Sequence, residues 1–535
     1  MRDAKDGGSD DGDTQGARAT EIELKLIGDT RALRRLHGGP LVQGRALAQA
    51  QAQRLETTYY DTEDMRLRGR GLALRVRKAG RKYLQSVKGE DAGAAALARR
   101  GEWEWPLSSP TPDLALIDAP GLRKRMKLKA DDAVHPLFTT RVRRARCVVE
   151  HAAADGSTGR IEVALDRGEI LFDASAVPIA ELELELLQGS PAAVYDLALA
   201  LHAAEPLAVE TRSKSLRGYA LALNEMPSWH RAPPLALAAD VITDDGMGAI
   251  FRACHDHWTA NHAAALAGDD PEGVHQMRVT LRRLRSALAV FRALIPVEQF
   301  GWLKAETRWL TQALGPARDA DVFLDELLAP VLAARPEDPA LAALAACAAA
   351  ARTEGYATAH AAMAEPRYTA FLLGLGRWIE ARGWRVGRVM ENAPSGQAPL
   401  ASLADRLLAK RHQAARKRGK GFKRLDAPAR HELRIAIKKL RYTAEFFAGL
   451  YDGVAAASFI AAAKALQDDL GHLNDVAVAE ARLDELRDGG GAEEAHAAGI
   501  VLGWHAHGAR RAEMALRPRW RAFIKAEPFW HQPTD

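Results

Sequence analysis

Charged residues alternate with aliphatic residues in Glu21-Ile22-Glu23-Leu24-Lys25-Leu26, near the start of the chain. In a β-strand successive side chains point to opposite faces, so the three charged residues share one face and the aliphatic residues share the other. Alone, this hexapeptide is typical of an exposed strand with a solvated charged face. The same alternation recurs at Arg75-Val76-Arg77, Glu102-Trp103-Glu104, Arg141-Val142-Arg143, Glu162 with Asp166, and Glu181-Leu182-Glu183-Leu184-Glu185. A sheet closed into a barrel would collect all these charges in its interior.

The first part of the chain has the pattern of a barrel of this kind. Besides the opening strand, short runs rich in β-branched and aromatic residues, separated by turn-prone links, predict strands over 55–61, 72–78, 82–88, 102–107, 138–150, 160–172 and 180–187. A helix is expected within 29–52, N-capped by Asp29 or Thr30, and another over 191–204. Eight antiparallel strands enclose about enough space for one small ligand.

The side chains expected to point inward divide by chemistry into two groups. Arginine offers a planar fork to two phosphate oxygens, and lysine offers a compact charge. The residues of these types, and therefore the candidate phosphate ligands, are Lys25, Arg75, Arg77, Lys88, Arg141, Arg143 and Lys214. Carboxylates suit a divalent cation with oxygen ligands, Mg²⁺ or Mn²⁺, and the acidic group is Glu21, Glu23, Glu102, Glu104, Glu162, Asp166, Glu181, Glu183 and Glu185. A glycosidase-like carboxylate pair is an alternative, but it does not call for so many cations. The two groups together suit a metal-bound polyphosphate.

The second half of the chain is predicted to be helical and contains a duplication. His275-Gln-Met-Arg278-Val-Thr-Leu-Arg282-Arg283-Leu284-Arg285 aligns with His431-Glu-Leu-Arg434-Ile-Ala-Ile-Lys438-Lys439-Leu440-Arg441. At the same offset, Leu314-Gly315-x-x-Arg318-Asp319 aligns with Leu470-Gly471-x-x-Asn474-Asp475. At the helical period each copy places one histidine and three cations in a stripe opposite an apolar face. One such stripe is usually a solvated face, but two matched stripes favour an anion-binding groove between the copies.

A basic run precedes and includes the second stripe. Between Arg406 and Arg441 there are 14 lysines or arginines and two acids, Asp426 and Glu432. Such a run favours a long polyanion and adds Lys410, Arg411, Arg416, Lys417 and Lys423 as candidate contacts. Nucleic acid is disfavoured because Phe422 and Tyr442 are the only aromatic residues there. A zinc site is disfavoured because each helix offers one histidine among arginines, and the histidines are expected to donate hydrogen bonds to phosphate with some pH sensitivity.

Bulk composition limits the remaining possibilities. The chain has 535 residues, a net charge of +5 and three scattered cysteines, which suggests several domains of a reduced cytosolic protein. No apolar run reaches the length of a membrane span, so we expect a soluble cytoplasmic protein. We predict a multidomain α+β protein with a disordered tail over 1–19, an eight-stranded antiparallel β-barrel over 20–225, a linker over 226–244 and an all-α bundle with a two-fold internal repeat over 245–525.

The ordered motifs of the first part resemble the CYTH domain of the triphosphate tunnel metalloenzymes. They are Glu21-x-Glu23-x-Lys25, Tyr60-Asp61-Thr62, Leu74-Arg75-Val76-Arg77, Ser86-Val87-Lys88-Gly89, Leu165-Asp166-Arg167-Gly168 and Glu181-Leu-Glu-Leu-Glu185. The resemblance implies an eight-stranded tunnel that hydrolyses or cyclises triphosphates with a divalent metal. It implies metal ligation by Glu21, Glu23, Glu183 and Glu185, with Asp166 contributing, and phosphate contacts from the cationic group.

The helical half resembles the CHAD domain, a bundle of two pseudo-symmetric halves implicated in binding inorganic polyphosphate. The resemblance implies contacts from His275, Arg278, Arg282, Arg285, His431, Arg434, Lys438 and Arg441. Together the two domains predict a metal-dependent inorganic triphosphatase with a polyphosphate-binding domain, associated with polyphosphate granules. The alternatives are a nucleotide or thiamine triphosphatase, an adenylyl cyclase, and a non-catalytic polyphosphate scaffold. Oligomeric state does not follow from the sequence.

Overall fold

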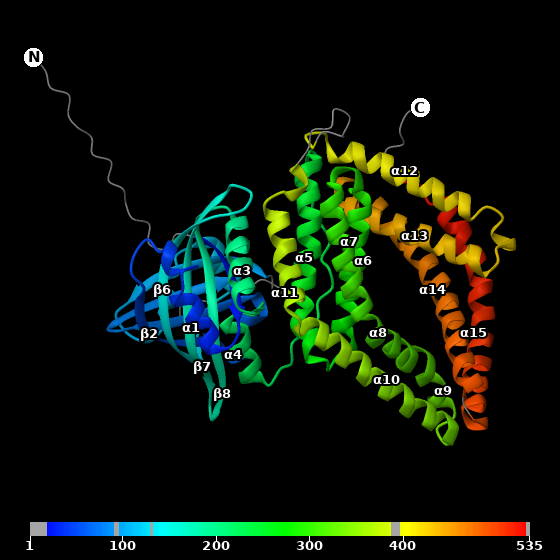
Figure 1. The fold of residues 1–535 in the computed structure, drawn as a ribbon, viewed down its shortest axis with the longest axis horizontal. Coiled ribbons are helices and arrows are strands. Elements are labelled where there is room, and N and C mark those ends of the chain that lie inside the picture. Colours follow the sequence, from blue (N-terminus) through cyan, green and yellow to red (C-terminus); the bar gives the residue numbers. More distant parts are fainter. Residues whose placement is uncertain (1–18, 90–95, 129–131, 387–395, 490, 531–535) are drawn as a thin grey trace, which may run out of the picture. The chain divides into compact units, whose positions relative to one another are not determined.

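The structure, a computed structural model, describes the backbone of residues 19–89, 96–128, 132–386, 396–489 and 491–530. It does not describe the side chains of 19, 20, 472–489, 494 and 507–515, and the predicted disordered tail lies almost wholly outside the described residues. The chain divides between Pro227 and Ser228 into two compact units (Figure 1). We describe each unit by itself.

The first unit is a closed antiparallel β-barrel. Its strands are β1 (Ala19–Ile27), β2 (Gln51–Asp61), β3 (Leu72–Ala79), β4 (Lys82–Gly89), β5 (Leu97–Leu107), β6 (His135–Ala152), β7 (Thr158–Phe172) and β8 (Ser175–Gly189). They pair in the order β5-β4-β3-β2-β6-β7-β8-β1, and pairing of β5 with β1 closes the ring. A short ninth strand, β9 (Ala208–Val209), pairs with β1. The predicted eight-stranded barrel is therefore confirmed.

Helices cover parts of the outer surface of the barrel. They are α1 (Thr30–Gly38), α2 (Pro120–Met126) and α3 (Pro191–Ala204), whereas α4 (Lys214–Leu223) packs against the interior residue Phe138. Helix α1 starts as predicted, because Asp29 accepts hydrogen bonds from the backbone N–H groups of Arg31 (2.9 Å) and Ala32 (3.2 Å). The aliphatic face of β1, with Leu24 and Leu26, is fully buried on the outside of the barrel. The barrel thus has its apolar surface outside, under helices, and its charged surface inside.

Aromatic side chains fill one end of the barrel interior. Tyr59 of β2 stacks on Phe138 of β6 with ring centroids 4.5 Å apart, and Phe138 meets the edge of Tyr219 of α4 at 5.4 Å. A Cβ at Gly218 would lie 2.0 Å from the ring of Phe138, so this close approach of α4 requires glycine. Ile170 and Ile179 belong to the same buried cluster. The charged interior is consequently confined to the rest of the barrel.

The second unit is all-helical, as predicted. Its helices are α5 (Thr243–Ala267), α6 (Pro271–Val290), α7 (Val297–Ala313), α8 (Gly315–Asp321), α9 (Ala329–Ala334), α10 (Pro339–Ala364), α11 (Pro366–Glu380), α12 (Leu400–Arg418), α13 (Ala427–Phe447), α14 (Gly453–Gly489) and α15 (Ala492–Lys525). The two aligned motifs lie on α6 and α13, and each helix follows an aspartate N-cap, Asp270 or Asp426. Among the helices that the structure describes, none has the length and hydropathy of a membrane span.

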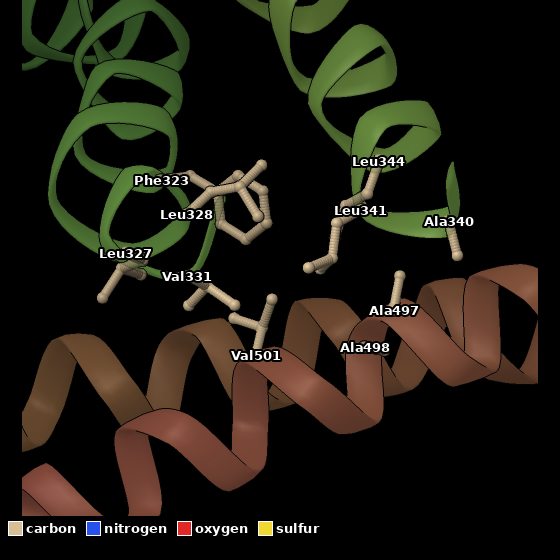
Figure 2. Close-up of a cluster of buried hydrophobic side chains, with 10 residues drawn as sticks. All are labelled: Phe323, Leu327, Leu328, Val331, Ala340, Leu341, Leu344, Ala497, Ala498 and Val501. Carbon is tan, nitrogen blue, oxygen red and sulfur yellow. The ribbon is translucent and has the colours of Figure 1, made fainter. Parts of the chain in front are cut away.

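A separate hydrophobic cluster joins the middle of this unit to its C-terminal helix (Figure 2). Leu341 of α10 and Val331 of α9 point toward Val501 of α15. Between α8 and α9 the chain forms a π-helical turn, Val322–Leu328, and its Leu327 carbonyl accepts a hydrogen bond from His505 Nε2 at 2.7 Å. The alanine-rich segment of α10 therefore buries one face, with Ala340, Leu341 and Leu344, in this cluster.

The predicted linker over 226–244 is attached to the helical unit through most of its length. Trp229 Nε1 donates to Asp270 at 2.9 Å, and the carbonyl of His230 accepts from His257 Nε2 at 3.0 Å and from Asn261 Nδ2 at 2.9 Å. Ile242 forms a β-bridge with Pro399. Residues 228–242 are thus part of the helical unit.

Candidate functional site

The barrel encloses a chamber of about 350 Å³ lined by charged side chains. The lining residues come from all eight strands and the start of α4: Glu21, Glu23, Lys25, Tyr59, Ala73, Arg75, Arg77, Lys88, Arg100, Glu102, Glu104, Arg144, Arg146, Glu162, Glu183, Glu185, Leu187, Ser213, Lys214 and Ser215. Neither a histidine nor a cysteine is among these described lining residues. The chamber therefore offers charge and hydrogen bonds and has no thiol or imidazole for covalent chemistry.

Lys88 and Arg75 are tied to carboxylates on two neighbouring strands. Lys88 Nζ lies 2.7 Å from Glu21 Oε2 and 3.1 Å from Glu102 Oε2. Arg75 donates from Nη2 to Glu102 at 2.9 Å and from Nε to Ser86 Oγ at 2.8 Å. Burial alone would lower the pKa of Lys88, but Glu21 reverses the effect and raises it. Both cations are thus fixed in position and charged.

Lys214 is the centre of a second network, which is largely buried at the wall of the chamber. Its Nζ lies 2.7 Å from Asp166, 2.5 Å from Glu181 and 2.7 Å from Glu183. Arg144 Nη2 lies 2.7 Å from the same aspartate. The carboxylates of Asp166, Glu181 and Glu183 lie close enough together to hold a metal ion. In this structure, however, the ammonium group of Lys214 lies between them, and Arg144 and Arg217 are paired with them as well, so three cations neutralise these three acids.

Lys214 reaches this network because α4 begins at that residue. The side chain of Ser213 accepts a hydrogen bond from the backbone N–H of Leu216 at 2.9 Å and so caps the helix. Ser213 and Ser215 both line the chamber. The helix start therefore contributes a cation and two hydroxyl-bearing residues to the site.

Arg77 is the cation of the chamber that lacks a carboxylate partner. No ion pair joins it to any residue that the structure describes, and its Nε is buried without a hydrogen-bond partner there. The neighbouring Arg75 lowers the pKa of Arg77 to about 10, and burial and Arg144 add to the fall. Arg77 therefore lies among like charges that its own surroundings do not balance.

Four carboxylates lie together on β1, β7 and β8, and one of them, Glu185, has no cationic partner among the described residues. Glu185 of β8 is paired directly with Glu23 on one side and with Glu162 on the other. Burial raises the pKa of Glu185 to about 7, and the carboxylate of Glu21 adds to the rise. Adjacent carboxylates of this kind are the oxygen ligands that a hard divalent cation prefers. Glu185 is therefore available to a metal ion, whereas Glu21, Glu23 and Glu162 are paired with Lys88, Lys25 and Arg146.

Most of the residues predicted for the barrel are brought together as expected. Lys25, Arg75, Arg77, Lys88, Lys214, Glu21, Glu23, Glu102, Glu104, Glu162, Glu183 and Glu185 all line the chamber. Asp166 and Glu181 lie behind the lining, fully buried, and bind Lys214. Glu23 is held ionised: burial opposes ionisation, but Lys25 and Arg100 keep the pKa of Glu23 at about 2.

The prediction that Arg141 and Arg143 line the chamber is wrong. Both lie on the outer surface, where they line a separate cavity, and the Arg141 side chain is 61% exposed at 3.3 Å from Glu56. The inward residues of β6 are instead Val142, Arg144 and Arg146. The strand carries arginines on both faces, so its alternation alone does not show which face points into the barrel. The hairpin register decides this: counting back from the Asp155-Gly156-Ser157 turn pairs Asp166 with Arg144.

Arg100 is a third lining residue that the sequence analysis missed. Its Nη1 lies 3.4 Å from Glu23 Oε1. The strand that carries it, β5, was expected to begin at residue 102 but begins at Leu97. Extending the alternation of Glu102 and Glu104 backward by two residues would have identified it.

In the helical unit the two predicted stripes converge where α6 packs against α13. Burial lowers the pKa of Lys438 on α13 to about 8, and Arg282 of α6 and Arg434 of α13 add to the fall. The Nε atoms of Arg278, Arg282 and Arg434 are buried without a hydrogen-bond partner among the described residues. Cations from both copies thus face a common space and repel one another.

The repeat extends to the glycines that follow each stripe. A Cβ at Gly315 would lie 3.3 Å from Arg278 Nη1, and a Cβ at Gly471 would lie 3.6 Å from Arg434 Nε. Each Leu-Gly motif therefore packs against the first arginine of its own stripe. The side chains of Asn474 and Asp475, which end the second motif, lie outside the described residues.

The remaining cations differ in their surroundings. His275 is half-buried, and burial lowers its pKa to about 4, with Arg318 adding to the fall. It is therefore neutral near neutral pH. Arg441 is bonded to Glu445 and, at 2.9 Å, to Gln467, while Arg285 and His431 are exposed.

The candidates on and after α12 are not part of the stripes. Arg411 donates to the carbonyl of Lys439 at 3.0 Å and to the hydroxyl of Thr443, so it fastens α12 to α13. Lys410, Arg416, Lys417 and Lys423 are exposed.

Comparison with known proteins identifies both units. A CYTH domain model matches residues 19–219, and a CHAD domain model matches residues 249–484. An inorganic triphosphatase of Haemophilus influenzae is 30% identical over 168 residues, which are 31% of this chain and 46% of that protein. An uncharacterised protein of Mycobacterium tuberculosis is 38% identical over 73 residues, 14% of each. The chain thus spans less than half the length of these curated relatives. The solved CHAD domain of the plant Ricinus communis is 32% identical, with a TM-score of 0.48, and the match covers 57% of this chain and 99% of that one.

Proposed function

The chain is a CYTH-CHAD protein, and on that premise we propose that its barrel is a metal-dependent inorganic triphosphatase and its helical unit binds inorganic polyphosphate. The proposed reaction is the hydrolysis of triphosphate to pyrophosphate and phosphate. One observation carries the proposal: a single chamber holds Arg77, which has no carboxylate partner among the described residues, and Glu185, which has no cationic partner there. A triphosphate chelated to a divalent cation is complementary to both.

Charge and positioning account for the chemistry, as they do in phosphoryl transfer generally. Arg75 and Arg77 offer guanidinium forks to phosphate oxygens. Lys25 and Lys88 are placed to offset charge that develops on the leaving pyrophosphate. Asp166 and Glu181 position Lys214, which in turn contacts Glu183 of the chamber lining.

A divalent metal, Mg²⁺ or Mn²⁺, would be held by Glu21, Glu23 and Glu185 with Glu162 beside them. When bound, it binds phosphate oxygens and lowers the pKa of the attacking water. Glu183, the fourth predicted ligand, is bound to Lys214 and Arg144, just as Glu21 is bound to Lys88 and Glu23 to Lys25. We propose that Glu183 stays with Lys214, because Asp166 and Glu181 hold that lysine in place beside it.

Inorganic triphosphate is the substrate that the lining favours. The uncharged residues of the lining are Tyr59, Ala73, Leu187, Ser213 and Ser215, which offer little apolar surface to a nucleobase or a thiazole ring. The H. influenzae relative, named an inorganic triphosphatase, supports the same choice.

In the helical unit we propose that polyphosphate lies along the α6–α13 groove. A phosphate chain there would accept hydrogen bonds from donors that lack a partner among the described residues, the Nε atoms of Arg278, Arg282 and Arg434. It would also favour the charged forms of Arg278 and Lys438, whose pKa values are lowered. The exposed residues Arg285, His431, Lys410, Arg416, Lys417 and Lys423 are proposed as outer contacts.

A phosphate-release panel tests the catalytic proposal. The full chain is assayed with Mg²⁺ on triphosphate, long polyphosphate, ATP and thiamine triphosphate, with and without chelator, beside Glu185→Ala. We expect release from triphosphate above the other substrates, loss with chelator, and a loss of about 10²-fold or more in the variant. Faster turnover of ATP or thiamine triphosphate would change the substrate. No release from any compound would leave a non-catalytic scaffold.

A further inference from the structure

Three arginines form a row across the outside of the barrel. Arg54 of β2 is paired directly with Arg143 of β6, and Arg143 is paired directly with Arg167 of β7. Directly paired residues share a face, and neighbouring strands lie about 4.8 Å apart, so the three side chains start as a ladder. The row is on the face opposite to Val142 and Arg144, outside the chamber.

This arrangement is unfavourable unless something compensates it. Like charges directly opposite one another destabilise a sheet. Among the residues that the structure describes, no carboxylate forms an ion pair with any of the three arginines, and Arg167 Nε is buried without a hydrogen-bond partner. The nearby Glu56 is bonded to Arg141. The ladder therefore has an excess of donors and positive charge.

The ladder lines a surface cavity of about 470 Å³. The charged residues of its lining are Arg54, Arg141, Arg143, Arg167, Lys78 and the single acid Glu56. Gly80 also lines it, as do Leu55 and Val142, which belong to the buried cluster of the barrel interior. None of these residues lines the catalytic chamber. The cavity is thus a second, independent basic site on the same unit.

We propose that this ladder binds a segment of linear inorganic polyphosphate on the outside of the barrel. Each guanidinium offers a fork to one phosphoryl group, and three forks in a row suit a chain that repeats the same anionic unit. A single-stranded nucleic acid is disfavoured because no aromatic residue lines the cavity for base stacking. The inference deepens the proposed function and rests on it: the barrel would hold the polymer beside the chamber that cleaves triphosphate.

The test measures binding of polyphosphate to the full chain in the presence of a chelator. Without a divalent metal the chamber should not hydrolyse the polyphosphate. Three proteins are compared in a background carrying Arg282→Ala and Lys438→Ala, which weakens the helical groove. They are the background itself, the background with Arg143→Ala and Arg167→Ala, and the background with Arg81→Ala and Arg160→Ala. The last pair removes the same charge from exposed positions of β7 and the β3–β4 turn that lie outside the cavity.

We expect residual binding in the background, a loss of about tenfold or more with the ladder changes, and less than about twofold with the control changes. Melting curves confirm folding, since removing the exposed Arg143 and the half-buried Arg167, which repel each other, should not lower the melting temperature. Equal losses in the ladder and control proteins, or no residual binding in the background, would overturn the ladder. Equal competition by orthophosphate, or tighter binding of single-stranded RNA, would overturn the ligand assignment.

The same data separate this inference from the proposed function. If the background binds as tightly as the unchanged chain, the groove proposal fails, and the ladder is still tested by its own pair. If the background loses all binding, the groove proposal stands alone. Phosphate release from triphosphate is assayed separately and reports on the chamber.

Discussion

The pKa values of two largely buried lysines, one in each unit, shift in opposite directions because their charged neighbours differ. In the barrel, burial acts to lower the pKa of Lys214, but Asp166 and Glu181 more than reverse it and the pKa is raised. In the helical unit, burial lowers the pKa of Lys438 to about 8, and Arg282 lowers it further. Both positions are basic sites for phosphate in our account.

The difference lies in how each unit treats its charge before an anion arrives. The barrel neutralises most of its cations with its own carboxylates, so its chamber is rigid and nearly complete without ligand. Along α6 and α13 cations face other cations, and the proposed polyphosphate would neutralise them. A rigid, internally paired chamber suits catalysis, which needs fixed geometry, whereas an unneutralised groove suits binding of a long polyanion.

The largest expected contrast is in stability. Lys214→Met leaves the three buried carboxylates of Asp166, Glu181 and Glu183 with two cations, Arg144 and Arg217, and removing one partner of a buried ion pair costs about 3–5 kcal/mol. Lys438→Met removes one of several mutually repelling cations and should leave stability within about 1 kcal/mol or raise it. Calorimetric or urea unfolding of both variants measures the two effects. If the two substitutions destabilise their units equally, the contrast is lost.

A smaller effect is expected on binding. Arg282→Ala and Lys438→Ala should each weaken polyphosphate binding by about tenfold, because each removes a donor to a charged ligand. Lys439→Ala is the matched control: it removes the same charge from the next residue, which is exposed and lies off the stripe. Titration of the full chain with polyphosphate compares them. A loss in Lys439→Ala as large as that in Lys438→Ala would mean that only net charge matters.

The smallest expected effect is a pH dependence of the groove. In the free protein Lys438 loses its proton above about pH 8, whereas a bound phosphate favours the ammonium form. Affinity for polyphosphate should therefore fall above about pH 8, by at most about tenfold per pH unit. Lys438→Arg should remove this fall, because arginine stays protonated. His275, with its pKa lowered to about 4, should contribute no change near neutral pH.

The sequence was sufficient to predict the barrel and its charged interior because the signal is local. Alternation in Glu21–Lys25 and Glu181–Glu185 fixes which side chains share a face, and closure of the sheet then gathers them. The duplicated helices were equally accessible, since Met277 and Leu281 fall opposite the stripe and are buried as the period predicts.

What the sequence analysis missed depends on register and tertiary contact. On β6 both faces carry arginine, so alternation could not separate Arg143 from Arg144, and only the hairpin register does. The Lys214 network joins a helix start to two strands, which no local pattern specifies. For the same reason, the sequence could not show which of the acidic residues pair with a cation and which, like Glu185, do not.

Diffraction from crystals grown with Mn²⁺ and a non-hydrolysable triphosphate analogue tests the central claim most directly. Our account predicts anomalous density for manganese against the carboxylate of Glu185, with the phosphate chain reaching Arg77. Manganese among Asp166, Glu181 and Glu183 with Lys214 displaced, or an analogue bound only outside the chamber, would contradict it.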